Sequence, residues 1–176
     1  PGGRTVGLWG FGRIAEQGSQ KIKACDMKAV CYDPFLTAEQ CEAAGATKLE
    51  TLDEVMQCAD FVSINTSLME STYHMVNAHH LSLMKPTAYL INCSRGGIIN
   101  EADLVQALKD GVIAGAGTDV YCNEPPKLDD PLLHCPNLIV SPHSAAQTRE
   151  AVIKMAQMCV NGCLAVCRGE KWPYVA

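Results

Sequence analysis

The turn GFGRIA, from Gly10 to Ala15, has the residue types and spacing that bind the pyrophosphate of a dinucleotide. It follows an apolar segment typical of a β-strand and opens a segment with helical periodicity. Gly10 allows a tight turn, Gly12 lets the backbone approach a phosphate, and Ala15 is small enough for close packing of helix against strand. The first N–H groups of a helix bind anions, and Arg13 would add positive charge. The turn therefore predicts a phosphate-binding site.

Asp33 stands at the end of the second expected strand, where an acidic side chain can bind both hydroxyls of a ribose. A carboxylate there would repel the 2′-phosphate of NADP, and the following Pro34 and Phe35 offer no cation. The alternative, a glycine-rich turn without a ligand, is disfavoured because strand, turn, helix and acid follow in the expected order. The sequence therefore predicts a site for NAD rather than NADP.

Three further polar side chains follow later strands: Arg95 in NCSRGG, Glu124 after GTDV, and His143 after NLIVSP. An arginine fork can hold a carboxylate with two parallel hydrogen bonds, and a histidine beside a carboxylate can move a proton near neutral pH. Taken singly, each residue is more typical of a surface or structural role. Together with a dinucleotide turn, at the strand ends where ligands bind, they predict oxidation of a 2-hydroxy acid.

These side chains need a sheet of parallel strands to hold them. The expected strands cover residues 4–9, 28–32, 46–49, 60–65, 88–93, 113–120 and 137–141. The expected helices cover residues 13–23, 37–44, 51–58, 101–109 and about 147–167. Residues 51–54 form a capping box, Asn100 caps the next helix, and Gly111 ends it. The alternation predicts an α/β, Rossmann-type, doubly wound, mostly parallel sheet of about seven strands with helices on both faces.

Composition excludes several classes of protein. The length of 176 residues suits one domain, and a net charge of −5 without a basic run argues against nucleic-acid binding. We expect no membrane partner, because no leader and no apolar run near 18 residues is found. The ten cysteines form no C-x-x-C pair, which indicates reduced, mostly buried cytosolic thiols.

No metal site is expected. Cys159, Cys163 and Cys167 lie four residues apart on one helix face, a spacing more typical of small-residue packing than of zinc ligands. The histidines at 74, 79 and 80 lack acidic or cysteine partners at ligand spacing, so we interpret them as surface or loop residues. Met69, Met75 and Met84 are interpreted as core or loop fillers.

Four segments carry a resemblance to a known family: GLWGFGRIA with CYDP, INCSRGGIINEADLVQAL, GAGTDVYCNEPP with PLL, and NLIVSPHSAAQT. Through these segments the chain resembles the D-isomer-specific 2-hydroxyacid dehydrogenases over nearly its whole length. Within that family, it is most similar to the phosphoglycerate dehydrogenases and to the hydroxypyruvate or glyoxylate reductases. The resemblance implies that Arg95 binds the substrate carboxylate and carbonyl. It also implies that His143 is the acid/base and Glu124 its partner.

The same resemblance implies how NAD would be held. Backbone around Arg13 and Ile14 would bind the pyrophosphate, and Asp119 would contact the nicotinamide carboxamide. Thr66, Cys93 and Ala145 would complete the cofactor contacts.

The chain departs from the family pattern in three places. Ala15 stands where glycine is usual, NTSL (65–68) replaces His-x-Pro-Leu beside the cofactor, and HSAAQT (143–148) replaces His-Ile-Gly-Gly-x-Thr. The last change bears on the nicotinamide side of the site, and therefore on which substrate is used.

The resemblance also implies a domain organisation. In this family the substrate domain comes from both chain ends and flanks the cofactor domain, so residues 1–176 are expected to be an NAD-binding domain without the substrate domain. The whole enzyme is expected to be a cytoplasmic homodimer acting on a small 2-hydroxy or 2-keto acid.

Two other functions share these motifs. An NAD-sensing corepressor-like binding module has the same fold, and residues flanking this segment would distinguish it. In a formate-type dehydrogenase a glutamine usually replaces the carboxylate partner, so Glu124 argues against that function.

Overall fold

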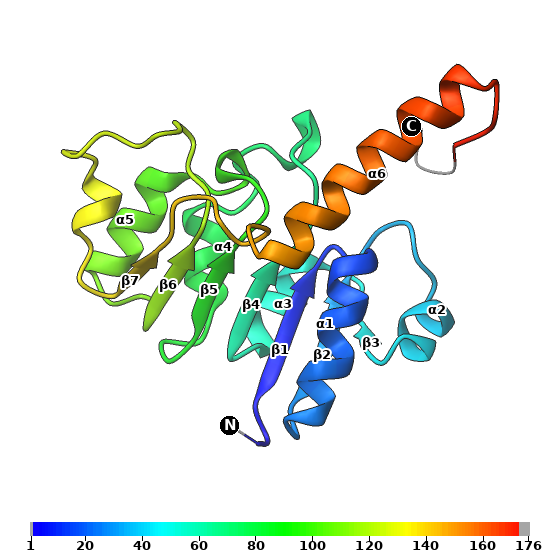
Figure 1. Cartoon of the computed structure of the whole chain (residues 1–176). Helices are drawn as coiled ribbons and strands as arrows, with labels where there is room; N and C mark the ends of the chain where they lie inside the picture. The colour runs from blue at the N-terminus through cyan, green and yellow to red at the C-terminus, as the bar shows by residue number, and fades with distance from the viewer. Residues whose placement is uncertain (1, 173–176) are drawn as a thin grey trace. The chain divides into compact units, whose positions relative to one another are not determined.

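The computed structural model describes residues 2–172, which belong to two compact units that divide between Pro142 and His143. Among the described residues, the first unit holds all seven strands, five of the six α-helices and three short 3-10 helices, at Glu70–Thr72, Gly96–Ile98 and Pro131–His134 (Figure 1). Its strands are β1 (Thr5–Trp9), β2 (Lys28–Tyr32), β3 (Thr47–Lys48), β4 (Phe61–Ile64), β5 (Tyr89–Asn92), β6 (Gly115–Thr118) and β7 (Leu138–Val140). Its α-helices are α1 (Arg13–Ala24), α2 (Ala38–Ala43), α3 (Leu52–Cys58), α4 (Ala78–Leu83) and α5 (Glu101–Lys109).

The seven strands form one sheet in the order β3-β2-β1-β4-β5-β6-β7, and every pair is parallel. All seven lie within the expected ranges, so the predicted Rossmann-type sheet is confirmed. Because the strands are parallel, the loops that follow them emerge at one edge of the sheet. The residues expected to bind cofactor and substrate in this unit all follow strand ends, and that edge gathers them.

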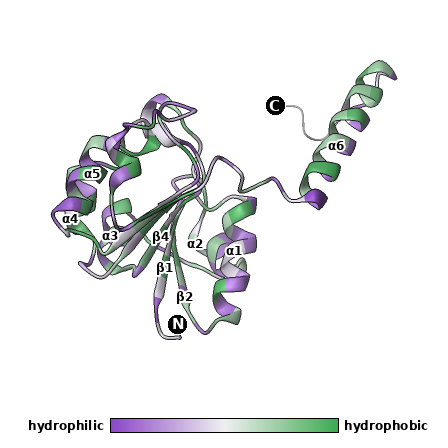
Figure 2. Ribbon diagram, turned by 60° about the vertical axis from the view of Figure 1, so that its left-hand side comes forward, coloured by the Kyte–Doolittle hydropathy of each residue, from purple (hydrophilic) through white to green (hydrophobic). Residues whose placement is uncertain are grey.

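Helices pack on both faces of the sheet, with α3, α4 and α5 on one side and α1 and α2 on the other (Figure 2). The larger core lies under α3–α5 and includes Val55, Ile64 and Leu90, each at most 1% exposed. The smaller core lies under α1 and α2 and includes Leu8 and Cys31. Burial of aliphatic residues on both sides of the central strands explains why those strands read as continuous apolar runs.

One part of the sheet departs from that pattern. Tyr89 on β5 and Ile139 on β7 are 44% and 79% exposed. The strand register places both side chains on the same face of the sheet as α1. That helix covers this face near β1 and β2, away from β5 and β7. Within residues 2–142 the helices therefore cover this face only in part.

The capping signals expected from sequence are present. The side chain of Thr51 accepts from the N–H of Glu54, whose carboxylate accepts from the N–H of Thr51, which completes the capping box of α3. Asn100 caps α5, and Gly111 has a φ of 67° just beyond its end. A second capping box, formed by residues 37 and 40 at the start of α2, had not been expected.

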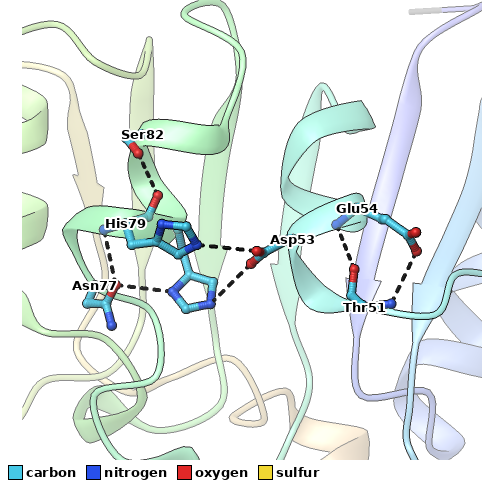
Figure 3. A network of polar contacts seen from close by, with 7 residues as sticks. Thr51, Asp53, Glu54, Asn77, His79 and Ser82 are labelled. Atoms are coloured by element: carbon cyan, nitrogen blue, oxygen red, sulfur yellow. Dashed lines mark hydrogen bonds and ion pairs between the residues drawn. The ribbon is translucent and has the colours of Figure 1, made fainter.

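The helix α4 was missed, and it corrects the interpretation of its two histidines. His79 and His80 belong to α4, and their Nε2 atoms lie 3.2 and 3.6 Å from the Asp53 carboxylate of α3 (Figure 3). Asn77 caps α4 and contacts the other ring nitrogen of His80. The pKa of His80 is lowered, mainly because burial disfavours its charged form. The histidines therefore do have an acidic partner, supplied by a helix distant in sequence.

The second unit contains α6 (Arg149–Cys167), capped by Thr148. Trp172 packs beside Gly162, where a Cβ would lie 3.2 Å from the indole nitrogen. Cys159, Cys163 and Cys167 line an apolar groove with this tryptophan. Among residues 2–172, no three His, Cys, Asp or Glu side chains are grouped so that they could hold a metal ion.

One expectation from composition is wrong, and another stays a prediction. The helix α6 is long and apolar enough to cross a membrane by length and composition alone, a test that core helices of soluble proteins also pass, so the absence of a membrane partner stays a prediction. The sequence did not indicate the apolar length of α6, because Gln157 and Asn161 interrupt its apolar run. The cysteines are all free, but only Cys31, Cys41 and Cys135 are buried, whereas the exposed ones lie on α1's end, on α6 and in strand-end loops.

Candidate functional site

The phosphate turn joins β1 to α1. Gly10 has a φ of 81°, and a Cβ there would lie 2.8 Å from the backbone nitrogen of Thr66, so only glycine fits. Gly12 is the N-cap of α1 and has open space where a Cβ would be. Ala15, 2% exposed, packs into the smaller core, as its place in the motif requires. The turn has the conformation and the open approach that a phosphate needs.

Asp33 lies beside this turn at the end of β2. One carboxylate oxygen accepts from the N–H of Phe11 and the other from the N–H of Phe35, each at 2.9 Å. Each oxygen can accept more than one hydrogen bond, so ribose hydroxyls can still bind. The side chain therefore holds the phosphate turn as well as offering a negative charge.

A cavity of about 500 Å³ opens between the ends of β1, β2 and β4. Met69 and Met75 belong to its lining, and Met75 also packs against the larger core. Met84 is buried in that core, as expected. Residues lining the cavity include Trp9, Gly10, Gly12, Tyr32, Asp33, Phe35, Asn65, Thr66, Met69 and Met75. A mainly apolar cavity with an acid in its lining suits an adenosine.

Arg95 follows β5 in a turn built by Asn92, which is only 2% exposed. The Asn92 amide donates to the carbonyl of Arg95 and accepts from the N–H of Ser94, both at 3.0 Å. The Ser94 hydroxyl donates to the carbonyl of Thr66, which links this turn to the one after β4. Sequence reasoning missed Asn92, although a buried asparagine that ends an apolar strand is itself a signal.

The guanidinium of Arg95 is exposed and donates from Nη1 to the carbonyl of Ser94 at 2.7 Å. Cys93, two residues earlier, is also exposed. Burial of part of its side chain and the charge of Asp119 raise the pKa of the Cys93 thiol. This thiol is therefore not poised as a nucleophile.

Asp119 and Glu124 follow β6. Asp119 is 2% exposed and accepts a hydrogen bond from the hydroxyl of Ser141 at 2.5 Å. Glu124 is exposed and accepts from the N–H of Tyr121 at 3.0 Å, which closes its own loop. The Tyr121 hydroxyl donates to the carbonyl of Ser141, so the loop is tied to the segment after β7.

His143 and Ala145 lie in the second unit. His143 is exposed and has a φ of 53°, which is uncommon for a residue other than glycine. Its carbonyl accepts from the side chain of Gln147 at 3.4 Å. Strained backbone of this kind often occurs at functional positions.

Direct contacts connect the strand-end turns of the first unit. Phe11 bonds to Asp33, Gly10 packs on Thr66, Thr66 accepts from Ser94, and the N–H of Asp119 donates to the carbonyl of Asn92. The expected residues Gly10, Gly12, Asp33, Thr66, Cys93, Arg95, Asp119 and Glu124 thus lie in one row along the carboxyl edge. Arg13 and Ile14 start α1 at the same edge, and Ile14 is 81% exposed.

The sequence profile of the family described as "D-isomer specific 2-hydroxyacid dehydrogenase, NAD binding domain" matches residues 1–145. The chain belongs to this family. It is 38% identical over 168 residues to D-3-phosphoglycerate dehydrogenase of Methanocaldococcus jannaschii, covering 96% of this chain and 32% of that protein. It is 39% identical over 168 residues to glyoxylate reductase of Korarchaeum cryptofilum, covering 96% of this chain and 50% of that protein.

Solved structures of family members have the same fold. The NAD complex of D-isomer specific 2-hydroxyacid dehydrogenase from Lactobacillus delbrueckii ssp. bulgaricus superposes with a TM-score of 0.87 at 33% identity. That match covers 97% of this chain and 55% of the other. The chain therefore spans about a third to a half of the length of these relatives, and it comprises the family's NAD-binding domain.

The residues present fit NAD. The open turn at Gly12 and the start of α1 suit a pyrophosphate, and the cavity beside Asp33 suits an adenosine. No cation among the residues lining that cavity would offset a 2′-phosphate.

Proposed function

We propose that the protein containing this domain oxidises D-2-hydroxy acids to 2-keto acids, reversibly, with NAD as the cofactor. The observation that carries the proposal is the row of connected strand-end turns. The phosphate turn and Asp33 lie toward one end of this row, and Arg95 and Glu124 lie toward the other. A dinucleotide laid along such an edge would bring its nicotinamide toward the arginine.

Each of the chain's own residues then has a role. Asp33 binds the adenosine ribose, and backbone near Gly12 holds the pyrophosphate. Asp119 binds the carboxamide of the nicotinamide, and the hydrogen bond that it accepts from the Ser141 hydroxyl supports its orientation. The chemistry that NAD supplies is acceptance of a hydride from C2 of the substrate.

Arg95 holds the substrate carboxylate with its guanidinium fork. His143 takes the hydroxyl proton during oxidation and returns it during reduction, and Glu124 is its proposed carboxylate partner. The exposed position of Arg95 supports its role, because a substrate must reach it from solvent.

We further propose that a separate substrate domain completes the site, since the relatives named above are about two to three times as long as this chain. The homodimer and the cytoplasmic location expected from the sequence stay predictions, which sedimentation of the protein at its natural length and fractionation of cells would measure.

The experiment compares the 176-residue chain with the protein at its natural length. Both should bind NADH in calorimetric titrations, but only the longer protein should reduce hydroxypyruvate, glyoxylate or the keto acid of 3-phosphoglycerate. Alignment of reactants accounts for roughly 7–11 kcal/mol of such barriers, and the short chain lacks a second wall for the substrate. NADH binding without turnover in the longer protein would instead favour the NAD-sensing module. If the short chain's kcat/KM is within about tenfold of the longer protein's, the proposal of a second domain is wrong.

A further inference from the structure

We infer that Glu101 is a positioning residue for this site: its carboxylate holds the loop that carries Glu124 against the turn that carries Arg95. The inference rests on the proposed function, because it concerns how that site is aligned. Glu101 itself touches neither substrate nor cofactor in the proposed arrangement.

The carboxylate of Glu101 reaches across to the neighbouring loop. Glu101 is the first residue of α5 and is half-buried. Its Oε1 accepts a hydrogen bond from the N–H of Cys122 at 2.7 Å, a short distance for a bond of this type. Cys122 lies two residues before Glu124 in the loop after β6. One side chain therefore connects the start of α5 to the Glu124 loop.

The Arg95 turn meets the same peptide bond from the other side. Gly96, which follows Arg95, is buried, and a Cβ there would overlap the carbonyl of Tyr121 and the nitrogen of Cys122. The two backbones thus lie in direct contact at the peptide bond whose N–H Glu101 accepts. Loss of that hydrogen bond would release the peptide that sets the distance between the Arg95 turn and the Glu124 loop.

Other contacts hold the neighbouring parts of the loop. Tyr121 donates its N–H to Glu124 and its hydroxyl to the carbonyl of Ser141. The Cys122 thiol lies near the carbonyl of Ile99, just before α5. The N–H of Cys122 donates instead to the carboxylate of Glu101. A hydrogen bond to a charged acceptor is stronger than one to a neutral acceptor, so it fixes the loop more firmly.

Cys122 provides a reporter for the contact. Burial, followed by the charge and hydrogen bonding of Glu101, raises the pKa of its thiol to about 12. Removal of the carboxylate should therefore increase the thiolate fraction of Cys122 and its rate of alkylation by iodoacetamide. Cys25, exposed at the end of α1, serves as an internal reference thiol.

The test uses three variants of the protein at its natural length. Glu101→Ala removes the acceptor, and Glu101→Gln keeps an acceptor oxygen without the charge. Asp103→Ala is the matched control, because Asp103 lies in the same helical turn and its carboxylate accepts the N–H of Ala78 at 2.9 Å, away from the Glu124 loop. For each variant, turnover, NADH affinity, the pH profile of reduction and peptide-resolved alkylation are measured.

We expect Glu101→Ala to lower kcat/KM for the keto acid by about tenfold or more, since small displacements of catalytic groups are costly. NADH affinity should stay within about twofold, because the adenosine and phosphate contacts are elsewhere. The pH profile of reduction should change, because a displaced Glu124 alters the charge around the histidine that it is proposed to partner. Glu101→Gln should recover most of the turnover while Cys122 alkylation stays fast, and Asp103→Ala should resemble the wild type in both.

The outcomes separate this inference from the proposed function. If Glu101→Ala folds and its turnover and pH profile match the wild type, the inference is overturned. It is equally overturned if Asp103→Ala loses as much turnover, which would indicate general destabilisation of α5. If the wild type reduces no 2-keto acid, the proposed function fails. The alkylation rates then test the contact between Glu101 and Cys122 separately, and an unchanged Cys122 rate in Glu101→Ala overturns the inference by itself.

Discussion

The backbone N–H of Phe11 donates a hydrogen bond to the carboxylate of Asp33 at 2.9 Å, which joins the phosphate turn to the end of β2. Asp33 also accepts from Phe35 in its own loop. The acid that would bind the ribose is therefore also a support of the phosphate turn. Substitutions of Asp33 should change cofactor selection and the shape of the turn together.

The first prediction concerns cofactor preference. The wild-type chain should bind NADH more tightly than NADPH, because Asp33 opposes the 2′-phosphate. Asp33→Ala should weaken NADH binding by about 1.5–3 kcal/mol, the range for a hydrogen bond to a charged group, and should narrow the preference. Calorimetric titration with both cofactors measures this. Asp33→Asn is the comparison variant: it removes the charge and keeps one acceptor oxygen, which can serve only one of the Phe11 and Phe35 N–H groups. Equal NADPH binding by the wild type would contradict the role given to Asp33.

The second prediction contrasts two glycines of one turn. Gly10→Ala should lower the free energy of unfolding by about 1–3 kcal/mol, because its φ is 81° and its Cβ would press on Thr66. Gly12→Ala should change that free energy by less than about 0.5 kcal/mol, because its Cβ would enter open space. The same Cβ would nevertheless stand where the pyrophosphate approaches, so NADH affinity should fall. Urea unfolding measures the two free energies, and NADH titration measures the affinity. Normal NADH binding by Gly12→Ala would contradict the role of Gly12 in the pyrophosphate site.

The third prediction tests the proton donor in the protein at its natural length. His143→Ala should reduce turnover by roughly 10²–10⁴-fold, the range for a general acid–base, while NADH affinity stays nearly unchanged. The imidazole acts on the substrate proton and not on the adenosine or the phosphates. Steady-state rates and NADH titration of the same preparation measure the two effects. A parallel loss of NADH affinity would indicate a structural role.

The fourth prediction tests the partner of that histidine. Glu124→Gln should change the pH profile of reduction, because it removes the negative charge of the proposed partner of His143. The amide oxygen can still accept from the N–H of Tyr121, so the loop should persist. The pH profile of kcat/KM provides the measurement. A profile that does not move excludes Glu124 as the partner.

The fifth prediction concerns stability and pH. Hydrogen bonding from the N–H of Thr5, together with Lys85 and Arg4, holds the pKa of Asp60 below its usual value. A lowered pKa stabilises the fold above the unfolded-state pKa, and that stability is lost as the pH falls through the folded-state pKa. Asp60→Asn should therefore be less stable than the wild type by about 1–2 kcal/mol at neutral pH.

The same comparison at low pH completes the test of Asp60. The difference between Asp60→Asn and the wild type should begin to shrink below about pH 4, where the carboxylate of the unfolded chain becomes protonated, and should be lost as the pH falls through the lower folded-state pKa. Urea unfolding at neutral and acid pH gives both free energies. A difference that is the same at both pH values would show that the charge of Asp60 contributes nothing.

The sequence by itself determined the elements that have strong local signals. Central strands such as β1 and β4 are apolar on both sides, so their composition alone indicates burial. The capping box at Thr51 and the stop at Gly111 act within a few residues of the chain, and the phosphate turn depends on glycines at set spacing. Local interactions of this kind can be read without knowing where the chain goes next.

The tertiary structure alone decided the contacts between segments distant in sequence. The helix α4 is six residues long and has too few apolar positions to show a helical period; it is supported by packing and by the bonds from His79 and His80 to Asp53. The Glu101 bond to Cys122 joins residues 21 apart, and nothing in either local segment indicates it. Hydrogen bonds and ion pairs of this kind depend on which strands are neighbours in the sheet, and that order follows from the packing of the whole chain.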